Sequence, residues 1–206
     1  MNNLPSIRLV PGVLRLLPLL LLCTLAHGTT YQFSTTLSGV NEAPPNASPA
    51  IGKGYVIYND VAQTMRVMTW FSGLTAGVTA AHIHGATAVA NTGTAAPATQ
   101  TPTFIGFPSG VTAGSYDHIF DMTLASSFRG GFITANGGTA ASASAALLTA
   151  MLAEKTYLNI HTSTFPGGEI RGFLHIAVPD GGATVLLLSL GLGAMAAITR
   201  RQKLRA

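Results

Sequence analysis

The sequence of 206 residues contains a single cysteine, Cys23, inside an apolar run near the N-terminus. A domain built from the rest of the chain has no disulfide and must be held by burial alone, which about 150 residues can provide. Charge is also scarce, at 9% of residues, which is low for a soluble protein. No Gly-x-Ser-x-Gly elbow occurs, and no spacing indicates a pair of catalytic carboxylates. The sequence therefore contains no recognisable catalytic constellation, and we do not expect hydrolytic activity.

The net charge of +4 belongs to the two ends of the chain. Two arginines lie in the first 15 residues, and four basic residues lie in the last seven. Between Thr29 and Val178 there are five basic and six acidic residues, which gives a net charge of −1. Basic ends around a weakly acidic middle are typical of membrane topology signals and not of a surface that binds nucleic acid.

The N-terminal residues resemble a secretory signal peptide. The run Leu16–Leu25 is almost entirely leucine, and arginines supply the positive charge of this segment. Ala26-His27-Gly28 places small residues at the two positions that signal peptidase inspects. We predict a signal peptide over residues 1–28, and the alternative is an uncleaved membrane anchor.

Residues 178–206 have a different character from the middle of the chain. A polar stretch, Val178-Pro179-Asp180-Gly181-Gly182, precedes the apolar run Ala183–Ile198, and four basic residues follow. About 16 to 19 apolar residues can just span a bilayer, and a basic cluster stays on the cytoplasmic side. We predict a C-terminal transmembrane helix that anchors the protein in the membrane. The alternative is a buried helix of the domain.

Residues 29–177 are expected to form one β domain. Alternating apolar and polar residues predict strands at Tyr31–Leu37, Gly52–Asn59, Thr64–Phe71, Ala80–His84 and Tyr116–Leu124. The segment 85–114 is expected to be a long surface loop with a short strand at Thr103–Phe107. One helix is expected at Ser142–Glu154, with a serine as N-cap. The fold class is therefore all-β, a Greek-key sandwich or barrel of about seven to nine strands with one short helix.

The stretch Tyr157–Leu174, which reads YLNIHTSTFPGGEIRGFL, predicts a β-hairpin. With a loop over 162–168, His161 faces Glu169, Asn159 faces Arg171, and Tyr157 faces Phe173. The aliphatic residues then lie on the opposite face, which suits a core. The other face would carry the histidine, the carboxylate, the guanidinium and the amide.

This hairpin resembles the C-terminal signature of the CHRD domain, a family named for its repeats in chordin and common in bacterial exported proteins. The family's second signature is a strand that ends in His-x-His-Gly, and residues 81–86 read AHIHGA. The resemblance spans roughly Tyr31–Ile176 and implies an immunoglobulin-like β-barrel. The tail resembles the PEP-CTERM class of sorting signals, in the variant that opens with Val-Pro-Asp-Ser-Gly. That resemblance implies a Gram-negative host and a sorting or processing protease as partner.

Three histidines are candidates for a metal site. His82 and His84 share one face of their predicted strand, and His161 lies opposite the apolar face of the hairpin. If these strands are neighbours, the three imidazoles converge outside the core. Imidazole suits copper and zinc, and Glu169 is a fourth ligand or a partner that orients His161. The alternative is structural: the histidines bond to loop backbone, and Glu169 pairs with Arg171.

Three functions remain open from the sequence. The first is an exported, non-catalytic binding or structural module, held at the inner membrane and periplasm or sorted to the outer surface or extracellular matrix. The second is an extracytoplasmic protein that binds copper or zinc through His82, His84 and His161. The third is a small metalloenzyme similar to superoxide dismutase. No motif in the sequence identifies a physiological ligand, and we expect no cofactor other than copper or zinc.

Overall fold

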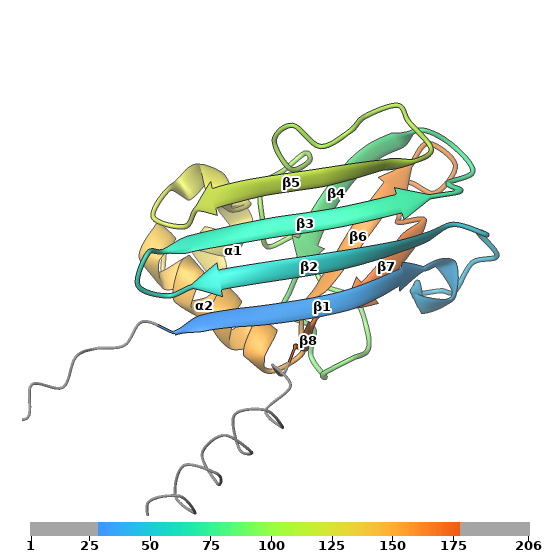
Figure 1. Cartoon of the computed structure of the whole chain (residues 1–206). Helices are drawn as coiled ribbons and strands as arrows, with labels where there is room; N and C mark the ends of the chain where they lie inside the picture. The colour runs from blue at the N-terminus through green and yellow to red at the C-terminus, as the bar shows by residue number, and fades with distance from the viewer. Residues whose placement is uncertain (1–28, 178–206) are drawn as a thin grey trace, which may run out of the picture.

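The computed structural model of the protein describes residues 29–177, which form a mostly β domain with two short α-helices. Eight strands make one antiparallel sheet (Figure 1). They are β1 (Thr30–Ser38), β2 (Ile51–Asn59), β3 (Thr64–Ser72), β4 (Val78–His84), β5 (Gly114–Asp121), β6 (Tyr157–Thr162), β7 (Ile170–Phe173) and β8 (His175–Ile176). The order in space is β4-β6-β7-β1-β2-β3-β5, with β8 paired to β1. The predicted number of strands is confirmed.

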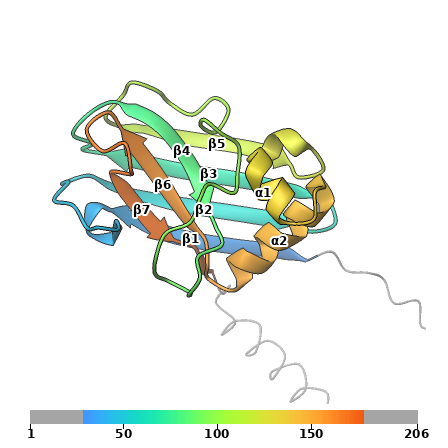
Figure 2. The same ribbon diagram turned by 180° about the vertical axis from the view of Figure 1, so that it is seen from behind.

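The sheet is strongly curled, so that β4, β6 and β7 lie across β1, β2, β3 and β5 (Figures 1 and 2). The two halves are in close contact, because a Cβ atom added to Gly54 of β2 would lie 2.6 Å from Leu158 Cδ2 of β6. Within residues 29–177 no pairing joins β4 to β5. One open, curled sheet therefore replaces the expected sandwich of two sheets or closed barrel.

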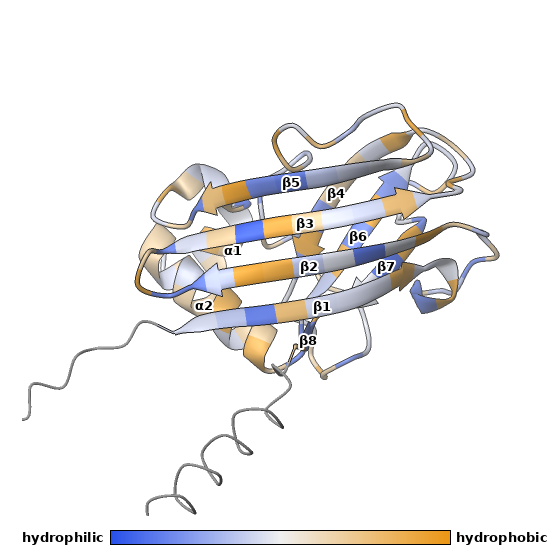
Figure 3. Cartoon of the chain, in the orientation of Figure 1, coloured by the Kyte–Doolittle hydropathy of each residue, from blue (hydrophilic) through white to orange (hydrophobic). Residues whose placement is uncertain are grey.

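Alternation of side chains along the strands produces the core between the two halves. Every second residue of β2 and β3, and of β1 from Phe33 onward, is buried, which gives the banded hydropathy in Figure 3. On β4, Ala81 and Ile83 are fully buried, and Leu158, Ile160 and Ile170 meet them from β6 and β7. Each large aliphatic side chain buried in this way contributes about 1.5–3 kcal/mol relative to exposure.

Two helices close one end of the curl, where a single helix was expected (Figure 2). The predicted helix is present as α2 (Ala140–Leu152), and its N-cap is Thr139, with Ser142 completing a capping box. The serine is thus the third helical residue and not the cap. The additional helix, α1 (Gly130–Ala135), opens with two glycines, which have low helix propensity, and this explains why the sequence pattern did not reveal it.

The long segment between β4 and β5 is ordered against the free edge of β4 and contains no strand at 103–107 among the described residues. The hydroxyls of Thr99 and Thr103 accept hydrogen bonds from Ile83 N and Ala81 N, at 2.9 Å each. Backbone bonds from Ala98 N to Ile83 O and from Phe104 N to Ala81 O complete the contact. The segment therefore occupies the edge of the sheet and keeps it from pairing with another chain.

The register predicted for the final hairpin is confirmed. Tyr157 pairs with Phe173, Asn159 with Arg171, and Ile160 with Ile170. β6 also pairs with β4, so that the two candidate histidine segments are direct neighbours in the sheet.

The predicted signal peptide (1–28) and the predicted transmembrane helix of the tail (178–206) lie outside the described residues. Within 29–177, no helix is long and apolar enough to cross a membrane.

Gly172 is expected to be intolerant of substitution, because a Cβ atom there would overlap Thr36 O and Thr35 Oγ1 of β1. Gly172→Ala should therefore lower the free energy of unfolding by about 1–3 kcal/mol, the usual cost of overpacking. Gly167→Ala is the matched control, because a Cβ at Gly167 meets nothing within 4 Å. Urea denaturation of both variants tests this, and equal stability of the two would contradict the contact between β7 and β1.

Candidate metal centre

Strands β4 and β6 bring His82, His84 and His161 together. On β4 the two histidines alternate with core residues Ala81 and Ile83, so both imidazoles point to the opposite face of the sheet. His161 comes from the neighbouring strand, where it pairs with Ala80. One ring nitrogen from each histidine lies within 4.8 Å of those of the other two.

Each of the three rings has a nitrogen close to a backbone carbonyl of a loop. His84 Nδ1 lies 2.9 Å from Ala95 O, and His161 Nδ1 lies 3.0 Å from Pro166 O. His82 Nε2 lies 2.6 Å from Pro102 O. A carbonyl oxygen can only accept, so these ring nitrogens carry the protons when the imidazoles are neutral. Metal-bound histidines are commonly fixed in this way.

The two remaining nitrogens of His84 and His161 face one another. Their Nε2 atoms are 3.4 Å apart. Because both Nδ1 atoms donate to carbonyls, both Nε2 atoms present lone pairs, and neither has a proton to share. Two nitrogen ligands of one tetrahedral zinc ion, with bonds of 2.0–2.1 Å, are separated by about 3.3–3.4 Å. The spacing therefore fits a shared cation.

His82 completes the group. Its Nδ1 is buried and has no hydrogen-bond partner among the described residues. A buried nitrogen without a hydrogen-bond partner is unfavourable unless a bound ligand, such as a metal ion, takes its lone pair. The ring lies 5.0 Å from that of His161 and 5.3 Å from that of His84, measured between centroids.

All three imidazoles are buried, whereas the sequence suggested a face outside the core. They are 6–8% exposed, because the loop after β4 and the β6–β7 loop cover them. Burial lowers the pKa of His82 and of His84 to about 4, although bonds to the carbonyls of Pro102 and Ala95 oppose the shift. Burial also lowers the pKa of His161. The imidazoles are therefore neutral at pH 7, the form that binds metal.

Comparison with known families agrees with the two signatures. The sequence matches the family model of the CHRD domain over residues 33–174, and a VPDSG-CTERM motif over residues 177–202. The chain belongs to the CHRD domain family. The C-terminal sorting motif implies export to the cell envelope or surface. No curated protein and no solved structure matches the chain.

Glu169 lies apart from the three imidazoles in this CHRD domain. Its Oε1 accepts from Ser48 Oγ and Thr75 N, and its Oε2 accepts from Thr162 Oγ1, at 2.6–2.7 Å. Complete burial alone would raise its pKa, but these hydrogen bonds together hold the pKa below its usual range. The carboxylate therefore joins three segments of the CHRD domain, and its oxygens are already occupied.

Arg171 pairs with a carboxylate other than Glu169. Its guanidinium lies 3.7 Å from Glu42 Oε2, measured from Nε, and both side chains are almost fully buried. Burial raises the pKa of Glu42 to about 7, although the neighbouring Arg171 lowers it. The role of Glu42 was not visible in the sequence, because it lies in a loop dense in proline and asparagine that carries no strand pattern.

Tyr157 connects the histidines to this ion pair. Its ring stacks on His84, with centroids 4.8 Å apart, and Arg171 Cζ lies 4.6 Å from the centre of the same ring. The tyrosine hydroxyl donates to Ala95 O, the carbonyl that also accepts from His84. The hairpin alternation predicted that Tyr157 and Arg171 share a face. It did not predict their stacking, which depends on the covering loop.

Proposed function

We propose that this exported CHRD domain is a non-catalytic module that binds one transition-metal ion, copper or zinc, through His82, His84 and His161. The observation that supports this proposal most directly is the distance of 3.4 Å between His84 Nε2 and His161 Nε2. Both nitrogens present a lone pair. Without a cation between them, these two acceptors repel one another. A site whose protein ligands are neutral imidazoles, with no thiolate among them, suits both Zn(II) and Cu(II).

The three histidines supply three ligands and leave a fourth position for a further ligand. Glu169 remains a candidate only if it gives up hydrogen bonds to Ser48, Thr75 and Thr162. Among the described residues the three histidines form the one group of three or more metal-ligating side chains. A bimetal centre similar to that of superoxide dismutase needs more ligands than this group supplies. This favours binding of a single ion.

Elemental analysis tests the proposal. Full-length protein, exported in a bacterial host grown with added zinc and copper and extracted from the envelope, should carry about one equivalent of metal. His82→Ala should carry almost none. The contrary outcome is wild-type protein without stoichiometric metal whose stability falls in His82→Ala, because that is what a purely structural role for the carbonyl bonds predicts.

The second part of the proposal places the domain at the membrane by its tail before any sorting by a protease. Deleting Gly181–Ala206 should convert a protein of the membrane fraction into a soluble periplasmic one, because the predicted apolar anchor is removed. Fractionation and immunoblotting measure this. A variant in which the four basic residues of the tail are kept but Ala183–Ile198 is removed separates anchoring from charge. Continued sedimentation of both variants with membranes would exclude the anchor.

A further inference from the structure

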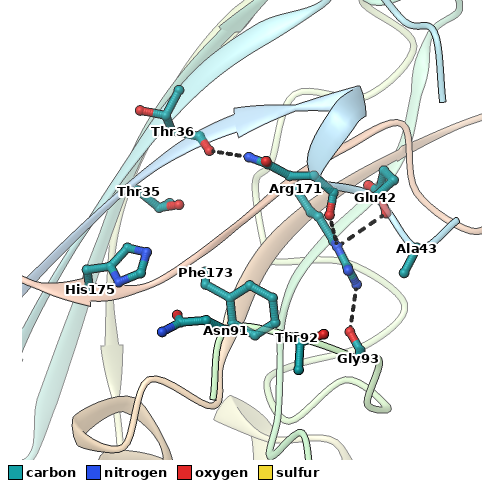
Figure 4. Close-up of a pocket in the computed structure, with 11 residues that line it drawn as sticks. Thr35, Thr36, Glu42, Ala43, Asn91, Thr92, Gly93, Arg171, Phe173 and His175 are labelled. Carbon is teal, nitrogen blue, oxygen red and sulfur yellow. Dashed lines mark hydrogen bonds and ion pairs between the residues drawn. The ribbon is translucent and has the colours of Figure 1, made fainter. Parts of the chain in front are cut away.

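A cavity separate from the three histidines lies between β1, β7 and the loop after β4. Its volume is about 600 Å³, within the range of small-molecule sites. Figure 4 shows Arg171 and Glu42 along one side, with Phe173 and Thr92 among the other lining residues. The lining is otherwise mostly neutral and polar. It includes Thr35, Thr36, Asn41, Asn91 and Thr92.

Arg171 has hydrogen-bonding capacity to spare at this cavity. Its Nε donates to Asn41 O at 2.5 Å, and its Nη1 donates to Gly93 O at 3.1 Å. A guanidinium has five N–H groups, so three of them lack an acceptor among the described residues. Glu42 makes no hydrogen bond to Arg171 at its distance of 3.7 Å. A buried guanidinium with free N–H groups is a strong site for a planar acceptor.

The charge of Arg171 is only partly compensated. Glu42 is 7% exposed, and its Oε1 has no hydrogen-bond partner among the described residues. Because burial raises the pKa of Glu42 to about 7, this carboxyl is partly protonated at neutral pH. The cavity therefore carries a net positive character that an incoming anion can neutralise.

We propose that this cavity binds a hydroxylated carboxylate of the size of a sugar acid, with the carboxylate on Arg171. A carboxylate matches the fork of the guanidinium and takes the N–H groups that lack acceptors. The hydroxyls of Thr35 and Thr92 have no hydrogen bond within residues 29–177 and are free to meet the ligand's own hydroxyls. Phe173 adds an apolar surface for the face of a sugar ring.

The inference is independent of the proposed metal. The cavity shares the loop of Gly93 and Ala95 with the histidines, but none of the three imidazoles lines it. Binding should therefore occur in protein stripped of metal with a chelator. A failure of metal binding leaves this inference intact, and a failure of ligand binding leaves the metal site intact.

Isothermal titration calorimetry on metal-free full-length protein tests the proposal, in a detergent without a sugar head group. The probes are D-glucuronate, D-glucose, which lacks the carboxylate, and cyclohexanecarboxylate, which lacks the hydroxyls. Glucuronate should bind saturably, and each of the other two should bind at least tenfold more weakly. Absence of glucuronate binding up to about 10 mM would overturn the proposal, and so would glucose that binds as tightly. Equal binding of cyclohexanecarboxylate would overturn the assignment to a sugar acid.

Two variants locate the binding. Arg171→Lys keeps the charge but loses the fork, and should weaken glucuronate binding at least tenfold. Arg171 is buried, so its replacement can also disturb folding, and a second variant is needed. Thr92→Trp changes an exposed residue, fills the cavity with the indole ring, and should also weaken glucuronate binding at least tenfold. Val61→Trp, on the exposed β2–β3 turn, is the control and should leave binding unchanged. Undiminished binding in folded Thr92→Trp would place the ligand elsewhere and overturn the proposal.

Discussion

Replacing His161 with alanine should weaken the binding of Zn(II) or Cu(II) by more than about 100-fold. Loss of a residue that merely supports a metal ligand costs 10–100-fold, and here one of three ligands is removed. The two imidazoles left on β4 cannot enclose an ion, because the nitrogen that faces His84 Nε2 at 3.4 Å is gone. Competition titration with a chromophoric chelator measures the change.

His118 provides the matched control, because it lies on β5 and outside the group of three. His118→Ala should change metal affinity by less than about twofold, since energetic coupling is expected only among residues in contact or in one network. Circular dichroism should show that both variants fold. Equal loss of metal in the two variants would mean that the ion binds to surface histidines and not to the centre.

The pH dependence of metal binding should reflect the buried imidazoles. An unperturbed imidazole takes up its proton near pH 6.5, so metal would begin to dissociate there. Burial lowers the pKa of His82 and His84 to about 4, so protons compete only at lower pH. Affinity should therefore stay nearly constant from pH 7 to about pH 5 and fall as pH approaches 4. A decline centred at pH 6.5 would indicate exposed ligands.

Glu169→Ala should lower the free energy of unfolding by about 3 kcal/mol or more. Three donors, Ser48 Oγ, Thr75 N and the buried Thr162 Oγ1, lose their acceptor together. Hydrogen bonds to a charged group are each worth about 1.5–3 kcal/mol, and a buried donor without a partner adds its own penalty. The loss also removes the side-chain hydrogen bonds that tie the β1–β2 loop and the β3–β4 turn to the final hairpin. Urea denaturation at pH 7 measures the effect.

Acid should reproduce part of this loss in the wild type. The folded-state pKa of Glu169 lies below its unfolded value of 4.5, so the folded state binds fewer protons than the unfolded state near that pH. Its contribution is complete above pH 4.5 and is lost as pH falls through the folded-state pKa. Glu154→Ala is the control for Glu169→Ala, because the Glu154 side chain is 37% exposed and its loss should change the free energy of unfolding by about 0.5 kcal/mol or less. Similar losses in the two variants would contradict the role of Glu169.

The face that each histidine occupies could be predicted from the sequence, because alternation with a period of two lets one register bury all aliphatic residues, whereas the pairing of β4 with β6 was only a condition of that prediction and comes from the structure. Ile83 and Ile160 both belong to the core, and their burial alone aims the neighbouring histidines to the other face. The pairing of Asn159 with Arg171 follows from the same rule. These predictions needed only the local alternation of residues, and the structure confirms the hairpin register and the burial of both isoleucines.

The cover over the histidines could not be predicted in the same way. Carbonyl oxygens of Ala95, Pro102 and Pro166 hold the rings, and a carbonyl belongs to every residue, so no side-chain pattern marks it. The loop after β4 follows the edge of that strand through threonine hydroxyls and not through a strand of its own. The engagement of Glu169 by three distant segments is equally invisible in sequence, where only its cross-strand neighbour His161 can be inferred.

X-ray absorption of the zinc-loaded protein tests the three-histidine centre most directly. The account predicts a zinc coordination sphere with three imidazole nitrogens at 2.0–2.1 Å, recognisable by the multiple scattering of the rings, and one further light ligand. His82→Ala should lose this signature. A sphere made only of oxygen ligands, or a wild-type spectrum with fewer than three imidazoles, would contradict the proposal that His82, His84 and His161 share one ion.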